Sequence, residues 1–513
     1  MKKFISLVLL VFSAGAFANP VADLEGKHGY DRRAAITRMS DTDWGGQRFS
    51  IEKGIELLQG LTGTDRYYAA KSLLGSNRYK RNMLPGNMSV RQMNAVLDGV
   101  GEQRGDLIAH LADFEIPAGN FGVAEIQSLI GDVAGDDYER SMKALMGSNQ
   151  MHRNYAISSL GVDQVDALLS RDTNRAGMIR YMADYAILEG NFTVDGAEKM
   201  MRTQSGMDRH DSVKALLGSN QQKRNYLNIP LSFVDAQRLL DGTALRSELI
   251  NYFSDRGVFA DRLTADEAAR LLENIKHTDR FETLKTLLGF NQQQRDYLRS
   301  PLSVNDVYTL LAGTAYRDEM IGLMADRGVI VDGISVADAV MMMEQITRAD
   351  RYDAVSSLLG NNKQKRSYIT LPITAAGAIQ LMEGGAYRDE LIGFMVDHGL
   401  IENRLSADDT VALLEDLVGM DRYDALLALM GENGQTRNYL DMPMGPSSMV
   451  SLFERTANRK ELIALIADQG MVDGTINAAE AEHLLGRLYG EEREQALKIL
   501  QGDNRLKRIY LSN

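Results

Sequence analysis

The chain has 513 residues, of which 44% are hydrophobic and 25% charged, with no cysteine and a formal net charge of −13. This composition is that of a folded protein, and the lack of cysteine excludes disulfides, thiolate metal sites and cysteine nucleophiles. The acidic balance argues against nucleic acid or an anionic membrane as a partner, since both are bound through clustered Lys and Arg.

Residues 1–18 have the pattern of a secretory signal peptide. Lys2 and Lys3 precede the apolar run Phe4–Phe12, and small residues at 16–18 form a cleavage site. Removing this leader takes away the two lysines and changes the net charge from −13 to −15. The apolar run is too short to span a bilayer, and no second run follows. We therefore expect an exported protein, bacterial and either periplasmic or secreted, whose mature chain does not insert into a membrane.

An internal repeat dominates the rest of the chain. A Gly-x-Asn element recurs at spacings of 72 residues once and 71 residues five times. Its asparagines are Asn77, Asn149, Asn220, Asn291, Asn362, Asn433 and Asn504. An arginine follows each asparagine by four residues, and a tyrosine follows the arginine by two in all copies but the first. The resulting candidate contact or seam residues are Arg153, Tyr155, Arg224, Tyr226, Arg295, Tyr297, Arg366, Tyr368, Arg437 and Tyr439.

A second marker recurs in the same register, an arginine and an aspartate nine residues apart. The pairs begin with Arg32 and Asp41 and end with Arg459 and Asp468. Nine residues are two and a half helical turns, so the two side chains cannot bond each other along one helix. Each must contact another element, and we expect Asp255, where its helix ends, to cap the segment that follows.

Each repeat reads as five helices, two of them short. Thr264 and Glu267 form a capping box at the start of one helix. A later helix ends at Gly289, because glycine adopts the left-handed conformation without strain. Asn291 is expected to cap a short helix that contains Arg295 and Tyr297. No segment alternates polar and apolar residues as a half-buried strand would, so the fold class is all-α.

The predicted architecture is an α-solenoid of seven tandem multi-helix repeats of about 71 residues, elongated and curved, with partial repeats as end caps. An N-terminal segment covers 19–29. The repeats cover 30–88 (partial, capping), 89–160, 161–231, 232–302, 303–373, 374–444 and 445–513 (C-terminal cap).

The recurring Arg and Tyr have two interpretations. They can form a row of identical ligand contacts, because Arg offers a planar fork for carboxylate or phosphate and Tyr a stacking face. Alternatively Arg295 pairs with an acid such as Asp279 while Tyr297 fills the seam between helices. Because they occur in every repeat, end repeats included, we expect both side chains to be buried in seams.

The sequence gives only weak signals for metal binding or catalysis. Asp473-Gly474 followed by Glu480 resembles the second half of a calcium loop, but the preceding positions lack carboxylates, so calcium stays a minor possibility and no other cofactor is expected. The seven histidines fall at different repeat positions, and no Gly-x-Ser-x-Gly elbow is present. The 71-residue spacing contains no insertion that would build a catalytic cleft. We expect no enzymatic activity and no catalytic or metal-ligating residues.

Three functions follow from this sequence. The first is a non-enzymatic scaffold that presents a multivalent surface to a protein or polymer partner. The second is a self-assembling structural protein of the envelope, the matrix or a particle, in which repeats stack between chains. The third is a hydrolase with a single non-repeating cleft.

Overall fold

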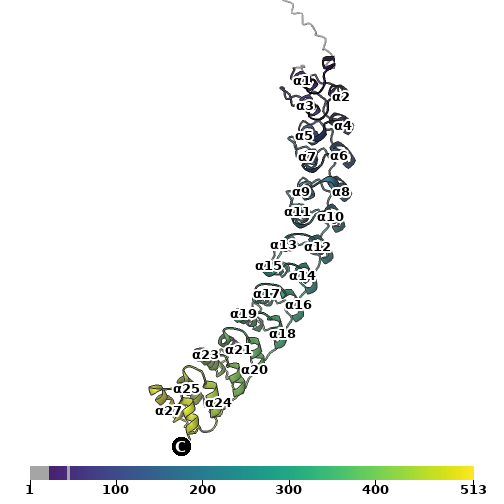
Figure 1. Cartoon of the computed structure of the whole chain (residues 1–513). Coiled ribbons are helices and arrows are strands. Elements are labelled where there is room, and N and C mark those ends of the chain that lie inside the picture. Colours follow the sequence, from purple (N-terminus) through teal and green to yellow (C-terminus); the bar gives the residue numbers. More distant parts are fainter. Residues whose placement is uncertain (1–21, 43–46, 513) are drawn as a thin grey trace, which may run out of the picture. The chain divides into compact units, whose positions relative to one another are not determined.

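The computed structural model describes residues 22–42 and 47–512, which contain 27 α-helices and three 3-10 helices (Figure 1). Within those ranges the backbone forms isolated β-bridges but no strand. The all-α prediction is therefore confirmed. The predicted signal peptide, residues 1–18, lies outside the described residues.

The chain divides into two compact bodies, Met1–Leu249 and Ile250–Asn513, and the division falls within helix α13 (Arg246–Arg256). The N-terminal body contains η1 (Ala22–Leu24), α1 (Gly29–Ser40), α2 (Ile51–Leu58), α3 (Gly63–Leu73), α4 (Val90–Leu97), η2 (Gly101–Gln103), α5 (Arg104–Asp113), α6 (Val123–Ile130), α7 (Gly135–Leu145), α8 (Val162–Leu168), η3 (Leu169–Arg171), α9 (Arg175–Asp184), α10 (Val194–Met200), α11 (Gly206–Leu216) and α12 (Phe233–Leu240).

The C-terminal body contains α14 (Ala265–Leu271), α15 (His277–Leu287), α16 (Val304–Leu311), α17 (Arg317–Arg327), α18 (Val336–Met342), α19 (Arg348–Leu359), α20 (Ala375–Met382), α21 (Arg388–Asp397), α22 (Ala407–Leu413), α23 (Gly419–Leu429), α24 (Pro446–Phe453), α25 (Arg459–Gln469), α26 (Ala478–Leu485) and α27 (Gly490–Leu500).

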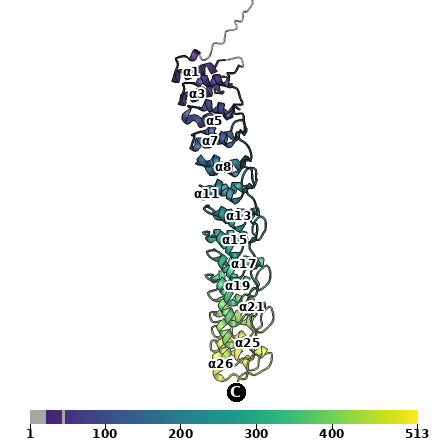
Figure 2. The same cartoon turned by 90° about the vertical axis from the view of Figure 1, so that its right-hand side faces the viewer.

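Two layers of helices make up each body. The even-numbered helices are short and form one layer, and the odd-numbered helices are longer and form the other (Figures 1 and 2). Successive short helices contact each other along a body, as α16, α18, α20 and α22 do. The long helices pack most closely in pairs, such as α5 with α7 and α17 with α19. Each body is thus an α-solenoid built of repeating helix pairs.

A repeat contains four helices, not the five expected from the sequence. In the repeat 303–373 these are α16, α17, α18 and α19, and the segment after α19 is a turn followed by extended backbone. A 71-residue repeat is therefore two helix pairs of about half that length, each a short helix followed by a long one.

Local sequence explains where the short helices begin. The Ser303 side chain accepts a hydrogen bond from the Asp306 backbone N–H at 3.2 Å, and Asp306 bonds back to the Ser303 N–H at 2.9 Å. The predicted box at Thr264 and Glu267 forms in the same way. Behind these caps, one face of each short helix is buried, as Val307, Leu310 and Leu311 are in α16.

Backbone bridges join the segments between the helices and define two edges of each body. We call C-edge the segments that follow the long helices, such as 328–335 and 360–374, and N-edge the segments that precede them, such as 312–316 and 343–347. Ile334 bridges to Ile369 on the C-edge, and Arg348 bridges to Gly385 on the N-edge. All the long helices of a body therefore point in one direction, with their N-termini on one edge and their C-termini on the other.

Candidate functional site

The Gly-x-Asn element forms a turn on the C-edge. The Asn291 amide donates to the Thr286 carbonyl at 2.8 Å and to the Arg295 carbonyl at 2.7 Å, so one buried side chain holds the helix end and the turn together. All seven asparagines make this pair of bonds. The predicted short helix after Asn291 is wrong, because Gln294 adopts a left-handed φ of 51° that helical backbone does not continue through.

The recurring aspartate caps this turn. Oδ1 of Asp255 accepts a hydrogen bond from the Gln292 backbone N–H at 2.9 Å, although the two residues are 37 positions apart. The same bond forms in all seven repeats. Asp255 acts as a cap, as predicted, but the prediction that it caps the segment directly after its own helix is wrong, because the turn that it caps follows the next long helix, α15.

The six recurring tyrosines are buried, as predicted. Tyr155, Tyr226, Tyr297, Tyr368, Tyr439 and Tyr510 are each 0% exposed. Each hydroxyl donates to a backbone carbonyl 43 residues earlier, as Tyr297 does to Ser254 at 2.9 Å. Burial raises the pKa of Tyr155, Tyr226, Tyr297 and Tyr439. These tyrosines seal the joint between successive long helices.

The recurring arginines are exposed, so the prediction that they are buried is wrong. Arg153, Arg224, Arg295, Arg366, Arg437 and Arg508 are all exposed. Each guanidinium lies over the ring of the tyrosine two residues on, between 4.7 Å for Arg366 and 5.7 Å for Arg437. Arg295 contacts Tyr297 in this way. Arg295 and Asp279, both of which the structure describes, form neither an ion pair nor a hydrogen bond with each other. The buried ring orients a cation that keeps access to solvent.

A different set of arginines is used structurally at the N-edge. Arg317, at the start of α17, donates to the carbonyls of Leu311 at 3.1 Å and Glu344 at 2.6 Å, which lie at the ends of the short helices on either side. Arg104 serves α4 and α6 in the same way, through Leu97 and Leu129. At both of these sites, backbone carbonyls at the ends of short helices accept hydrogen bonds from the arginine of the nine-residue pair.

An equivalent arginine, which was not predicted, stands at the start of the second long helix of the repeat. Arg351 donates to the carbonyls of Leu381 and Gln380, both at 3.0 Å, and burial lowers its pKa. The recurring signal is Asp-Arg-aromatic, at Asp279-Arg280-Phe281, Asp350-Arg351-Tyr352 and Asp421-Arg422-Tyr423. Tyr138 replaces the arginine in one repeat, and its hydroxyl donates to the Leu168 carbonyl instead.

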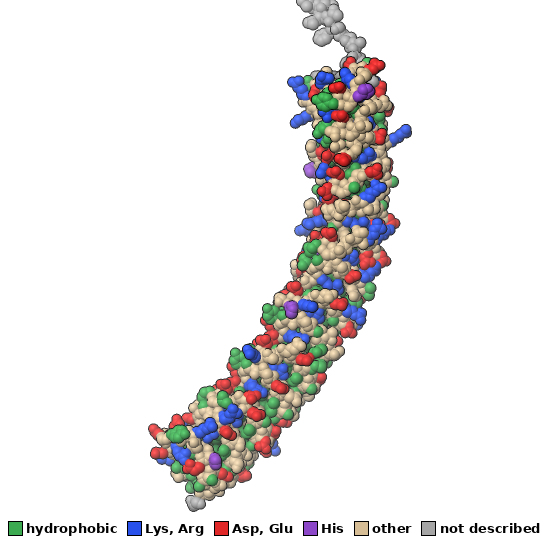
Figure 3. All heavy atoms as spheres, viewed as in Figure 1, with side chains coloured by type: hydrophobic (Ala, Val, Ile, Leu, Met, Phe, Trp, Pro, Cys, Tyr) green, Lys and Arg blue, Asp and Glu red, His purple; other side chains and the backbone are tan. Residues whose placement is uncertain are grey.

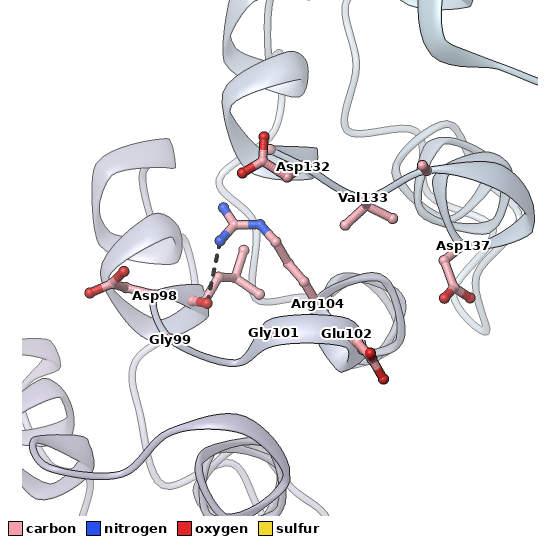
Figure 4. Close-up of a pocket in the computed structure, with 11 residues that line it drawn as sticks. Asp98, Gly99, Gly101, Glu102, Arg104, Asp132, Val133 and Asp137 are labelled. Atoms are coloured by element: carbon pink, nitrogen blue, oxygen red, sulfur yellow. Dashed lines mark hydrogen bonds between the residues drawn. The ribbon is translucent and has the colours of Figure 1, made fainter.

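Hollows occur at equivalent positions of the N-edge in the two bodies. Hollow 1, between the starts of α5 and α7, is lined by Asp98, Glu102, Arg104, Asp132 and Asp137 among others. Figure 4 shows Arg104 projecting between Asp98 and Asp132, with its bond to the Leu97 carbonyl. Burial lowers the pKa of Arg104, and the two acids oppose this. Since its donors are used internally, hollow 1 offers a ligand mainly carboxylates.

Hollow 2 occupies the same register three repeats later, between the starts of α17 and α19. Its lining includes His277, Tyr316, Arg317, Asp318, Glu319 and Asp350. Gln103 stands at the corresponding position of the earlier repeat and does not line hollow 1, whereas Tyr316 lines hollow 2 and is 53% exposed. Hollow 2 therefore adds an aromatic surface to the carboxylates.

Elsewhere on the face in view, basic and acidic side chains are interspersed in both bodies (Figure 3). Among residues 22–42 and 47–512, no group of three or more His, Asp or Glu side chains is placed to hold a metal ion. Glu480 of the calcium-like loop accepts a hydrogen bond from the Asn477 backbone N–H at 2.9 Å as part of a helix cap. None of the described helices has the length and apolar character needed to cross a membrane.

Comparisons with known proteins give no family. No protein-family model matches the chain, and no curated protein matches its sequence. Among solved structures, the chain aligns with a circular tandem repeat protein with novel repeat topology and enhanced subunit contact surfaces. The alignment covers 91% of this chain and 76% of that one at 11% identity, with a TM-score of 0.09. A likeness this low carries no argument about fold or function.

Proposed function

We propose that the chain is an exported, non-enzymatic α-helical repeat scaffold that presents a multivalent binding surface to a protein or polymer partner. One observation carries the proposal. An exposed arginine lies over a buried tyrosine at six successive Gly-x-Asn turns, which occupy every second segment of the C-edge. The structure of the turn itself depends on the asparagine, the aspartate and the tyrosine. Apart from its contact with the tyrosine ring, the guanidinium makes contacts that differ between repeats, such as the bond from Arg224 to the Glu189 carbonyl and the ion pair of Arg366 with Asp332.

The chemistry of this row indicates an anionic partner. A guanidinium presents a planar set of donors that matches a carboxylate, and the ring beneath it restricts its motion before binding. Single exposed contacts of this kind are weak, but contacts on one partner at several turns of a body multiply their effect. A carboxylate-bearing protein or polysaccharide fits this surface, because one carboxylate accepts two parallel hydrogen bonds from one guanidinium.

Export is supported by the leader at 1–18, with its two lysines, apolar run and small-residue cleavage site. The absence of insertions between Gly147 and Gly502 supports a role without catalysis, since a grafted active site needs a loop that departs from the repeat. We place the protein in the periplasm or outside a bacterial cell.

The test uses poly-L-glutamate and polygalacturonate as carboxylate polymers. Replacing Arg295, Arg366, Arg437 and Arg508 by Gln removes four row members from the C-terminal body. Affinity measured by calorimetry is expected to fall stepwise as these arginines are removed one by one. A charge-matched control replaces Arg262, Lys276, Arg404 and Arg487, which are exposed outside the turns, and should retain most of the binding. Equal losses in both variants, or no binding of either polymer by the unchanged protein, would refute the arginine row.

Self-assembly is tested in the same preparation by light scattering. A scaffold stays monomeric over a wide range of protein concentration. A mass that rises steadily with concentration would favour the structural alternative, in which repeats stack between chains.

A further inference from the structure

The N-edge of the C-terminal body carries two equivalent clusters of exposed tyrosine and carboxylates. Cluster A consists of Tyr316, Asp318, Glu319 and Asp350, which line hollow 2. Cluster B consists of the residues 71 positions later, Tyr387, Asp389, Glu390 and Asp421. The two clusters lie on the opposite edge from the arginine row and play no part in the function proposed above.

The tyrosine of each cluster is fixed in place yet open to solvent. Tyr316 is 53% exposed and Tyr387 52%. The Tyr316 ring meets the Phe281 ring edge-on at 5.5 Å, and Tyr387 meets Tyr352 in the same way at 5.7 Å. Each ring therefore has one side packed against the protein and another free to contact a partner.

The backbone at these tyrosines is held in an unfavourable conformation. Their φ angles are 52° and 55°, in the left-handed region that a bulky residue seldom adopts. The residue before each tyrosine is held by a backbone bond: the Ala315 N–H donates to the His277 carbonyl at 3.3 Å, and the Ala386 N–H donates to the Arg348 carbonyl at 3.1 Å. Asn458 stands at the same position of the following repeat with a φ of 49°. Asparagine tolerates this conformation well, so the fold does not require tyrosine there.

Within residues 22–42 and 47–512, the carboxylates of the clusters have no cationic partner. No ion pair involves any of the six acids among the described residues. The neighbouring Arg317 donates hydrogen bonds to the Leu311 and Glu344 carbonyls, and Arg388 forms an ion pair with Asp416 outside the cluster. Burial, together with the charges of Asp350 and Glu319, raises the pKa of Asp318. A cation placed between these acids would relieve their mutual repulsion.

We propose that clusters A and B form a docking surface for one extended polypeptide segment that carries two lysine or arginine side chains. Each cation lies against the face of a tyrosine and is bonded by the carboxylates beside it. Hollow 1 has the carboxylates but lacks the aromatic ring, so it is not part of this surface.

The spacing of the helices sets the spacing of the two cations. Clusters A and B begin two long helices apart, from α17 past α19 to α21. Packed helices lie about 9 Å apart, so the clusters are separated by roughly 18 Å. An extended chain covers about 3.3 Å per residue, which places the two basic residues about five or six positions apart.

The experiment uses fluorescent peptides of Gly and Ser that contain two lysines, separated by five residues or adjacent to each other. Binding to the full mature chain is followed by anisotropy at low and high salt. The five-residue spacing should bind at least tenfold more tightly than the adjacent pair, and high salt should weaken it. A peptide with glutamates in place of the lysines should not bind.

Variants separate this surface from the arginine row. Tyr316→Asn combined with Tyr387→Asn copies the residue found at Asn458, so the fold is retained and circular dichroism should be unchanged. This variant, and Asp318→Asn with Asp389→Asn, should each lower the affinity at least tenfold. Asp98→Asn with Asp132→Asn in hollow 1, and the four-arginine variant of the C-edge, should bind the peptide normally.

Unchanged affinity in both cluster variants would overturn the proposal, as would equal binding of the two lysine spacings. Saturable binding of Ca²⁺ that is lost in the aspartate variant, without any binding of the lysine peptides, would also overturn it and identify the clusters as cation sites. Because the arginine row is intact in every cluster variant, failure here leaves the result with the carboxylate polymers unaffected.

Discussion

The carboxylate of Asp255 accepts a hydrogen bond from the backbone N–H of Gln292 at 2.9 Å, and this bond fastens the end of α13 to the turn that follows α15. Equivalent bonds in the other repeats make it the most regular side-chain contact between successive long helices. A charged acceptor bonded to a backbone donor stabilises more than a neutral pair does.

Replacing Asp255 by Ala should therefore lower the free energy of unfolding by about 1 to 3 kcal/mol, because the Gln292 N–H loses its partner. Urea denaturation followed by helical circular dichroism measures the change. The control is Asp261→Ala, an exposed aspartate in the loop that follows α13. A loss no larger than that of the control would show that water replaces the carboxylate without cost.

Tyr297 provides two separable contributions, a buried ring and a hydroxyl bonded to the Ser254 carbonyl. Tyr297→Phe removes only the bond and should cost about 1 kcal/mol. Tyr297→Ala also removes the ring and should cost roughly 3 to 5 kcal/mol as a large-to-small change in a packed core. Similar losses for the two variants would contradict the assignment of the ring as the main seal between helices.

The sequence predicts the repeat well because its markers are residues that the fold needs in every copy. Asn291, Asp255 and Tyr297 each bond backbone groups of a neighbouring segment, so their spacing reports the spacing of the helices. The number of helices was wrong because the residues after Asn291 carry no signal for the left-handed turn at Gln294. Asparagine is a favoured residue both at the start of a helix and in a tight turn, so the residue type does not distinguish the two structures. Only the backbone dihedral angles do.

Recurrence alone could not predict whether the arginines are buried or exposed. Arg295 and Tyr297 recur together, yet the ring is enclosed and the guanidinium lies above it in solvent. Arg351 was not predicted because the same repeat position holds Tyr138 in another repeat, and this substitution hides the pattern. The Tyr138 hydroxyl and the Arg351 guanidinium nevertheless both donate to a carbonyl at a helix end. The hollows depend on segments between helices, which repeat in position but not in sequence.

Arg351 and Arg366 give a matched pair of buried and exposed arginines. Arg351→Gln leaves the carbonyls of Gln380 and Leu381 without their charged donor and should destabilise by roughly 2 to 3 kcal/mol. Arg366→Gln removes a guanidinium that lies on a ring at the surface and should shift the urea midpoint much less. If the two midpoints shift equally, the arginine row is structural after all.

His110 makes the N-terminal body sensitive to acid. Burial, aided by the charge of Lys71, lowers the pKa of His110 to about 4, while the imidazole of the unfolded chain takes up a proton near 6.5. Between these values the unfolded state binds more protons, so stability falls as pH is lowered from 6.5 towards 4, by up to about 3 kcal/mol. His110→Gln keeps a donor for the Leu74 carbonyl and should flatten this part of the pH profile. Identical profiles of the urea midpoint for the two proteins between pH 7 and 4.5 would contradict it.

Contacts in each body run mainly between neighbouring helices, such as α16 with α18 and α17 with α19, so stability should be close to a sum over repeats. A shortened chain of residues 232–445 retains three complete repeats, and we expect it to fold with the helical signal per residue of the full chain but a lower urea midpoint. Its affinity for the carboxylate polymers should be reduced in proportion to the arginines that remain, Arg295, Arg366 and Arg437, because each contributes a similar weak contact.

An enzyme would behave differently, since losing the one repeat that holds its cleft abolishes activity and losing any other does not. The decisive measurement is therefore a series of chains shortened one repeat at a time. A gradual loss of polymer binding supports the distributed surface, and an abrupt loss on removing one particular repeat, with the helical signal intact, would refute it.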